Sequence, residues 1–114
     1  MIRFSETVAG KYGVNAAIVA ELIWALRHDV AKKKMTAEKY DRKWFRYSMK
    51  EMTLDLRCLS IDMVKDAVKV LIDNGVLRKD NFNNSKFDHT NWYAFTDYGT
   101  QLMKKGDWLY ETIL

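Results

Sequence analysis

Two histidines and one cysteine are the residues of this chain best suited to metal binding or nucleophilic catalysis. His28 and His89 are far apart in the sequence, so they do not have the spacing typical of a metal site. Cys58 is surrounded by apolar residues, which predicts a small side chain in the core rather than a nucleophile. A single cysteine cannot form an internal disulfide, which indicates a reducing, cytoplasmic location.

The acidic residues give no indication of catalysis either. Aspartates and glutamates are scattered over polar faces, without the paired and buried setting that acid–base catalysis needs. The chain contains no glycine-rich phosphate loop, no G-x-S-x-G motif and no H-E-x-x-H motif. We therefore expect no enzymatic activity, no metal, no cofactor and no small-molecule substrate.

The basic residues could contact phosphate groups. The formal net charge is +4 and the isoelectric point is about 9.2. The densest cationic group, Lys32–Lys34, is more typical of a solvated helix end than of a phosphate-binding site. Charge alone therefore favours a nucleic-acid partner only slightly.

A rigid element must present such side chains, and the clearest one is a helix predicted over residues 60–74. Ser60 is a typical N-cap, and Gly75 is a typical residue just beyond a helix, where the left-handed conformation ends it. Apolar residues recur between them at three- and four-residue spacing, which predicts one buried face. That face comprises Ile61, Val64, Ala67, Val68, Leu71 and Ile72.

The segments on both sides of this helix also have clear signals. Ser48 and Glu51 have the capping-box spacing, so we expect a short helix there, followed by a turn of about three residues. Segments 43–48, 76–79 and 92–96 predict short strands, and the last two would form a hairpin around a polar loop. Alternation would place Trp92 and Ala94 on one side of the last strand, and Tyr93 and Phe95 on the other.

Residues 15–26 predict a first helix that is apolar almost all the way round, with Asn15 as its N-cap. Such a helix must be covered on more than one side. We favour a central core helix, and contact with a second copy of the chain is the alternative. The C-terminal tail is a second candidate for that homo-oligomer contact. Its apolar residues are Trp108, Leu109, Tyr110, Ile113 and Leu114.

The remaining segments have weaker signals. Residues 1–13 are expected to be irregular or a short helix, and residues 35–42 a polar connection. A final helix is expected from about Asp97, although Gly99 weakens it. No apolar run approaches the ~20 residues that a membrane crossing needs, so no membrane partner is expected. Without a linker or repeat, the sequence predicts a single domain over residues 1–114.

With these elements in order, the chain from about Gly13 to Met103 resembles the winged-helix DNA-binding domains of phage and plasmid replication proteins. These include replisome organisers and the N-terminal domains of primosomal proteins of the DnaD type. The resemblance rests on NAAIVAELIWAL, KWFRYSMKEM, LSIDMVKDAVKVLIDNGVLRK and NFNNSKFDHTNWYAFT. It implies a mainly α fold with a small β-sheet, a winged helix-turn-helix with a three-helix core, a β-hairpin wing and an extra C-terminal helix.

The resemblance also implies double-stranded DNA as the partner, with helix 60–74 in the major groove and the wing at 80–91 on the backbone or minor groove. The helix positions that would face DNA are Ser60, Asp62, Met63, Lys65, Asp66 and Lys69. The wing positions are Asn83, Asn84, Ser85, Lys86 and His89.

Two carboxylates in the predicted recognition helix keep other functions open. Asp62 and Asp66 would lie near phosphates and could offset Lys65 and Lys69. Asp66 and Lys69 could also pair across one helical turn. We therefore carry three hypotheses: a replication protein that binds DNA, a transcription regulator with the same fold, and a protein–protein assembly module that does not bind DNA.

Overall fold

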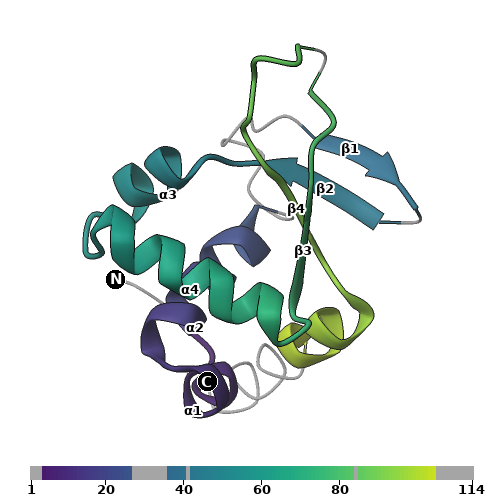
Figure 1. Ribbon diagram of the computed structural model, residues 1–114. Coiled ribbons are helices and arrows are strands. Elements are labelled where there is room, and N and C mark those ends of the chain that lie inside the picture. Colours follow the sequence, from purple (N-terminus) through teal and green to yellow (C-terminus); the bar gives the residue numbers. More distant parts are fainter. Residues whose placement is uncertain (1–3, 27–35, 41, 84, 105–114) are drawn as a thin grey trace.

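The computed structural model describes residues 4–26, 36–40, 42–83 and 85–104. The fold is mainly helical with a small antiparallel sheet, as predicted. The helices are α1 (Glu6–Tyr12), α2 (Val14–Ala25), α3 (Met49–Leu56), α4 (Ile61–Asp73) and a further helix that includes residues 97–104. The strands are β1 (Thr36–Lys39), β2 (Arg42–Arg46), β3 (Leu77–Asp80) and β4 (Trp92–Phe95). Figure 1 shows α1, α2 and α4 below β1 and β2, α3 level with β2, and the loop between β3 and β4 at the top of the view.

One glycine separates the first two helices. Ser5 caps α1 by accepting a hydrogen bond from the Val8 amide, and Gly13 both ends α1 and begins α2. The φ angle of Gly13 is 96°, a conformation that L-residues rarely adopt. The prediction of Asn15 as N-cap is therefore wrong, because Gly13, with its positive φ, is the N-cap and lies two residues earlier.

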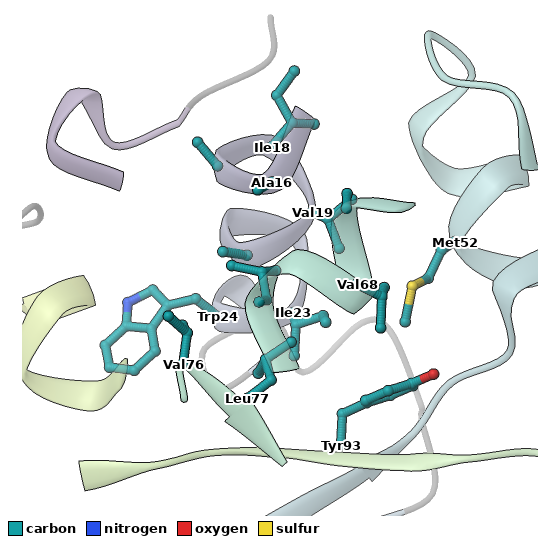
Figure 2. Packing of buried hydrophobic residues seen from close by; sticks show 14 of the residues in the cluster. Ala16, Ile18, Val19, Ile23, Trp24, Met52, Val68, Val76, Leu77 and Tyr93 are labelled. Carbon is teal, nitrogen blue, oxygen red and sulfur yellow. The ribbon is translucent and has the colours of Figure 1, made fainter. Parts of the chain in front are cut away.

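Helix α2 is the central core helix that we favoured. It contacts α1, α3 and α4, which cover it on several sides. Figure 2 shows its side chains packed among residues of α4 and the sheet. The Trp24 ring meets the Phe95 ring edge to face, with 5.2 Å between centroids. The buried residues of α2 are Ala16, Ala17, Ile18, Val19, Ala20, Ile23 and Trp24.

The caps predicted for α3 and α4 are confirmed. Ser48 and Glu51 form both hydrogen bonds of a capping box, and the Ser60 side chain accepts from the Met63 amide at 3.2 Å. Arg57, with φ 61°, takes the left-handed position that ends α3. The prediction of a buried Cys58 is wrong, because the tight turn after Arg57 leaves that side chain exposed.

The sheet has the strand order β1-β2-β4-β3, and every neighbouring pair is antiparallel. Predicting residues 35–42 as a polar connection is wrong for β1, which pairs with β2 from Thr36↔Phe45 to Lys39↔Arg42. Apart from Thr36, the residues of β1 have little strand propensity of their own. Hydrogen bonds to the neighbouring strand therefore determine their conformation, and Tyr40, with φ 57°, makes the turn.

The side chains of β4 divide between the two faces of the sheet as the alternation predicted, and all four are buried. Tyr93 and Phe95 belong to the main core, on the face of the sheet that packs against the helices. Trp92 and Ala94 lie on the other face with Trp44, where Phe82 of the 81–91 loop packs against them. The Phe82 ring lies 5.1 Å from the Trp44 ring and 5.8 Å from the Trp92 ring. The loop is thereby attached to the outer face of the sheet.

The last described helix packs directly on backbone. A Cβ atom on Gly99 would lie 2.1 Å from the Val76 carbonyl oxygen, so only glycine allows this approach. The expected C-terminal tail contact, His28 and Lys32–Lys34 lie outside the described residues. Within the described part of the chain, no helix has the length and apolar character that a membrane crossing requires.

Candidate nucleic-acid interface

Helix α4 turns the predicted contact residues to the surface. Val64, Ala67, Val68 and Leu71 are buried in the core. The spacing of apolar residues in the sequence therefore predicts the orientation of the helix correctly, except that Ile61 at its start is 41% exposed. The six predicted positions Ser60, Asp62, Met63, Lys65, Asp66 and Lys69 are all exposed.

The charged side chains of α4 share its exposed face. Successive residues of a helix are rotated by ~100°, which places Asp62, Asp66 and Asp73 along the outermost line, opposite Leu71. Lys69 borders that line, about 20° from Asp62, and Lys65 lies about 60° from Asp62 on the same side. No ion pair joins Asp66 to Lys69 in the described part of the chain, where Asp97 pairs with Arg42 and Asp88 with Arg46. The two lysines thus lie on the groove side of α4, with Lys69 beside Asp62 and one turn before Asp73.

A groove runs between α4 and the β3–β4 hairpin, on the side to which the lysines point. Lys65 and Lys69 line it from the helix, and Lys79 of β3 lines it from the sheet. Its volume is about 330 Å³. Asp73 is the carboxylate at its edge, so the three ammonium groups give the groove a positive character. The rest of the lining is Met49, Val68, Ile72, Asn91 and Tyr93.

Sequence reasoning missed Lys79. The signal that could have found it is the alternation of β3: Leu77 faces the core, so Lys79, two residues on, points to the same side of the sheet. Its strand partner is Tyr93, whose ring is buried beneath the groove. Burial raises the pKa of the Tyr93 hydroxyl, so this group remains neutral at physiological pH.

The hollow surface continues toward the loop. A second groove of about 330 Å³ shares Met49, Asn91 and Tyr93 with the first. It passes the start of α3, where the capping box occupies Ser48, and reaches His89. The two grooves together connect the helix lysines with one predicted loop residue.

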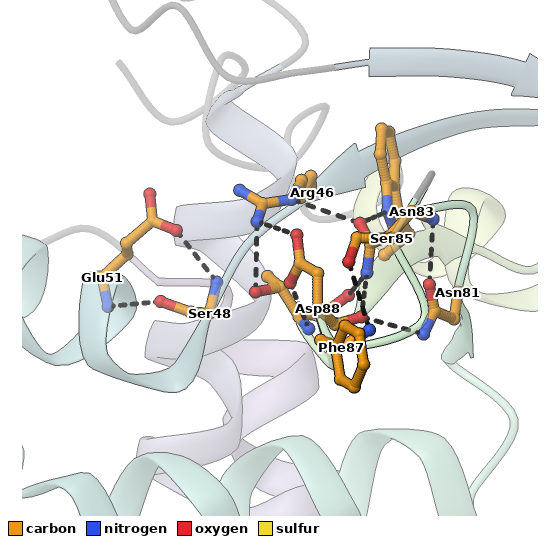
Figure 3. Close-up of polar contacts among 10 residues, drawn as sticks. Arg46, Ser48, Glu51, Asn81, Asn83, Ser85, Phe87 and Asp88 are labelled. Atoms are coloured by element: carbon orange, nitrogen blue, oxygen red, sulfur yellow. Dashed lines mark hydrogen bonds and ion pairs between the residues drawn. The ribbon is translucent and has the colours of Figure 1, made fainter.

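Asn83 organises the loop from within (Figure 3). Its Nδ2 donates to the carbonyl oxygens of Thr90 at 2.7 Å and Asp88 at 3.0 Å. Its Oδ1 accepts from the Trp92 indole at 2.8 Å and from Arg46 Nε at 3.3 Å. Asn83 was predicted to contact DNA, but its half-buried amide is occupied by the protein. Its role in this structure is to shape the loop.

An ion pair ties the same loop to the sheet. Arg46 Nη2 donates to Asp88 Oδ2 at 2.7 Å and to Thr90 Oγ1 at 3.2 Å. The Thr90 amide donates to Asp88 Oδ1 at 3.0 Å. The hydrogen bond from the Thr90 amide and the Arg46 guanidinium together lower the pKa of Asp88 to about 2. The carboxylate is therefore ionised, and the pair intact, over the physiological pH range.

The end of the loop is exposed. Ser85 Oγ accepts from the Phe87 amide at 3.2 Å, and the Ser85 carbonyl accepts from the Asp88 amide at 3.1 Å. Lys86 Nζ lies 5.5 Å from the Phe87 ring centroid. Of the predicted loop residues, Ser85, Lys86 and His89 are accessible to a partner. Asn84 lies outside the described residues.

The described residues contain no group of three or more His, Cys, Asp or Glu side chains that could hold a metal ion. Tyr47, which precedes α3, donates a hydrogen bond to Asp55 near the end of that helix, and burial raises the pKa of the Tyr47 hydroxyl well above its usual value. Comparisons with protein families, curated proteins and solved structures found no match for this chain.

Proposed function

We propose that this chain is a winged-helix protein that binds double-stranded DNA, with α4 as the recognition helix and the 81–91 loop as the wing. The observation that carries the proposal is the groove between α4 and the hairpin, where Lys65, Lys69 and Lys79 converge. Ammonium groups from two separate elements around one hollow are suited to a phosphate backbone.

The order of the elements supports this proposal. A winged helix has a helix, a strand, the helix-turn-helix pair and then a hairpin, with the early strand paired to the last one. Helix α2, strand β2, helices α3 and α4, and strands β3 and β4 follow in that order, and β2 pairs with β4. The resemblance noted in the sequence favours a role in replication of a phage or plasmid, and transcription regulation is the alternative within the same fold.

The positions of the charged side chains on α4 suggest how the helix would bind DNA. Its lysines would contact phosphates on the side of the hairpin. The outermost line of the helix, with Asp62 and Asp66, would face base edges, where a carboxylate can accept a hydrogen bond from cytosine N4. In this orientation Asp62 and Asp66 would face bases, and Asp73 would be the one carboxylate among the three lysines of the groove.

The test is fluorescence anisotropy with a mixed pool of duplex DNA at ~50 mM and ~200 mM salt. We expect saturable binding that weakens steeply with salt, because each neutralised phosphate releases counterions. Lys65→Ala, Lys69→Ala and Lys79→Ala should each reduce the slope of log K against log salt by about one. Lys11→Ala is the control, since Lys11 is exposed on α1 and outside the groove. Equal slopes for the groove variants and the control would refute the interface.

A protein–protein assembly module is the second candidate. Leu54 on α3 is 64% exposed, and Ile61 and Met63 at the start of α4 are each 41% exposed. Apolar side chains beside an acidic line would suit a partner with a basic rim. Absence of DNA binding even at ~50 mM salt would overturn the DNA proposal and favour this candidate.

A further inference from the structure

Phe87 is the most exposed large apolar side chain among the described residues, at 81%. Its ring projects from the end of the 81–91 loop (Figure 3). A single exposed apolar residue is ordinary on a protein surface. What distinguishes Phe87 is the rigidity of its support.

The backbone on both sides of Phe87 is fixed. Ser85 accepts hydrogen bonds from the Phe87 and Asp88 amides, and Arg46 and Thr90 hold the Asp88 carboxylate. Earlier in the loop, the Phe82 ring packs against the Trp44 and Trp92 rings. The backbone that carries the ring of Phe87 is therefore held by the protein itself, which lowers the entropy cost of ordering this part of the loop on binding.

We propose that Phe87 is an apolar wedge that enters the minor groove of bound DNA and partly unstacks one base step. This inference rests on the proposed function. A rigid loop end fits the minor groove, which is ~6 Å wide and too narrow for a helix. Wedges of this kind combine an inserted apolar side chain with nearby cations on the backbone. Lys86, next to the ring, is that cation.

The proposal predicts where the wedge acts. Pyrimidine–purine steps such as TA unstack most easily, so they are the steps at which insertion costs least. The protein should therefore prefer duplexes that contain such a step, even without hydrogen bonds to its bases. Unstacking should also bend the duplex away from the wedge.

The experiment uses a ~20-base-pair duplex with 2-aminopurine at a single TA step, and a matched duplex without a pyrimidine–purine step, both at ~50 mM salt. The wild-type protein should raise 2-aminopurine fluorescence at the TA step. Phe87→Ala should abolish that rise and weaken binding about tenfold, with an unchanged salt slope, because the lost contact is uncharged. Phe87→Leu should retain most of the rise, since leucine also serves as a wedge.

Two controls separate the wedge from other effects. Lys86→Ala should reduce the salt slope by about one while keeping the fluorescence rise. Tyr40→Ala removes another exposed aromatic ring, 73% accessible in the β1–β2 turn, and should change neither quantity. If wild-type protein binds but Phe87→Ala keeps the fluorescence rise, the wedge is refuted and the DNA-binding proposal remains. If wild-type protein does not bind, both proposals fail.

Discussion

Replacing Asn83 by alanine tests whether this residue shapes the loop or contacts DNA. The sequence placed Asn83 among the DNA-contacting residues together with His89. In the structure their settings differ: the Asn83 side chain makes four hydrogen bonds within the protein, and His89 is exposed. The two alanine variants should therefore behave differently in the absence of DNA.

The expected loss of stability in Asn83→Ala depends on the groups that would lose their hydrogen-bond partner. A hydrogen bond contributes about 0.5–1.5 kcal/mol net, and a buried donor left without an acceptor costs about 1–3 kcal/mol. Trp92 is only 4% exposed, so its indole N–H would lose its acceptor in the interior. The carbonyl groups of Asp88 and Thr90 are nearer to water and would lose less. We expect Asn83→Ala to lower the free energy of unfolding by about 2–3 kcal/mol.

Urea and thermal unfolding, followed by circular dichroism, measure this difference. For a chain of 114 residues, 2–3 kcal/mol corresponds to a fall in Tm of roughly 10 °C. His89→Ala should unfold within about 0.5 kcal/mol of the wild type. Asn83→Asp keeps the acceptor for Trp92 but removes both donors, so it should fall between the two.

Equal stability of Asn83→Ala and His89→Ala would refute the role of Asn83 in the loop. If Asn83→Ala were also stable and lost DNA binding, Asn83 would be a contact residue, as the sequence suggested. If it is destabilised as expected, any loss of DNA binding must be measured at a temperature at which the variant is still folded.

Two further predictions concern stability. Gly99→Ala should lower the free energy of unfolding by about 2 kcal/mol or more, because the added Cβ would overlap the Val76 carbonyl. Gly10→Ala, in open space on α1, should raise it by about 0.5–1 kcal/mol in the same urea assay. Equal effects of the two variants would contradict the close packing of Gly99 on Val76. Asp88 has a folded-state pKa of about 2 against an ordinary 3.8, so its contribution is present above pH ~4 and lost as the pH falls to ~2. Tm should therefore fall more steeply across that window for the wild type than for Asp88→Asn, and parallel curves would contradict the ion pair with Arg46.

The features predicted correctly are those with local causes. The cap at Ser60, the capping box at Ser48 and Glu51, and the left-handed Gly75 each depend on residues within three or four positions. The alternation along β4 is local as well, and it assigned the four side chains of this strand to the correct faces of the sheet. Such signals can be read from sequence because the interacting groups are fixed by helix and strand geometry.

The errors have non-local causes. Strand β1 forms because β2 offers it hydrogen bonds, and its own residues give little indication of a strand. The partners of Asn83 include Arg46, 37 residues earlier in the chain, so its inward orientation has no local pattern. Lys79 becomes part of the groove only when β3 lies beside α4. A sequence can indicate that a loop is polar, but not which polar groups that loop uses to hold itself together.

The same distinction bears on the charge of α4. Summed along the sequence, its aspartates offset Lys65 and Lys69, which argues against DNA. In space, the groove is lined by three lysines and one aspartate, Asp73, while Asp62 and Asp66 are exposed to water outside its lining. Charges in water are screened over ~10 Å at ~0.1 M salt, whereas a phosphate seated among three ammonium groups would interact with them directly. The quantity that decides the proposed binding is therefore the local charge of the groove, which the lysine substitutions measure directly.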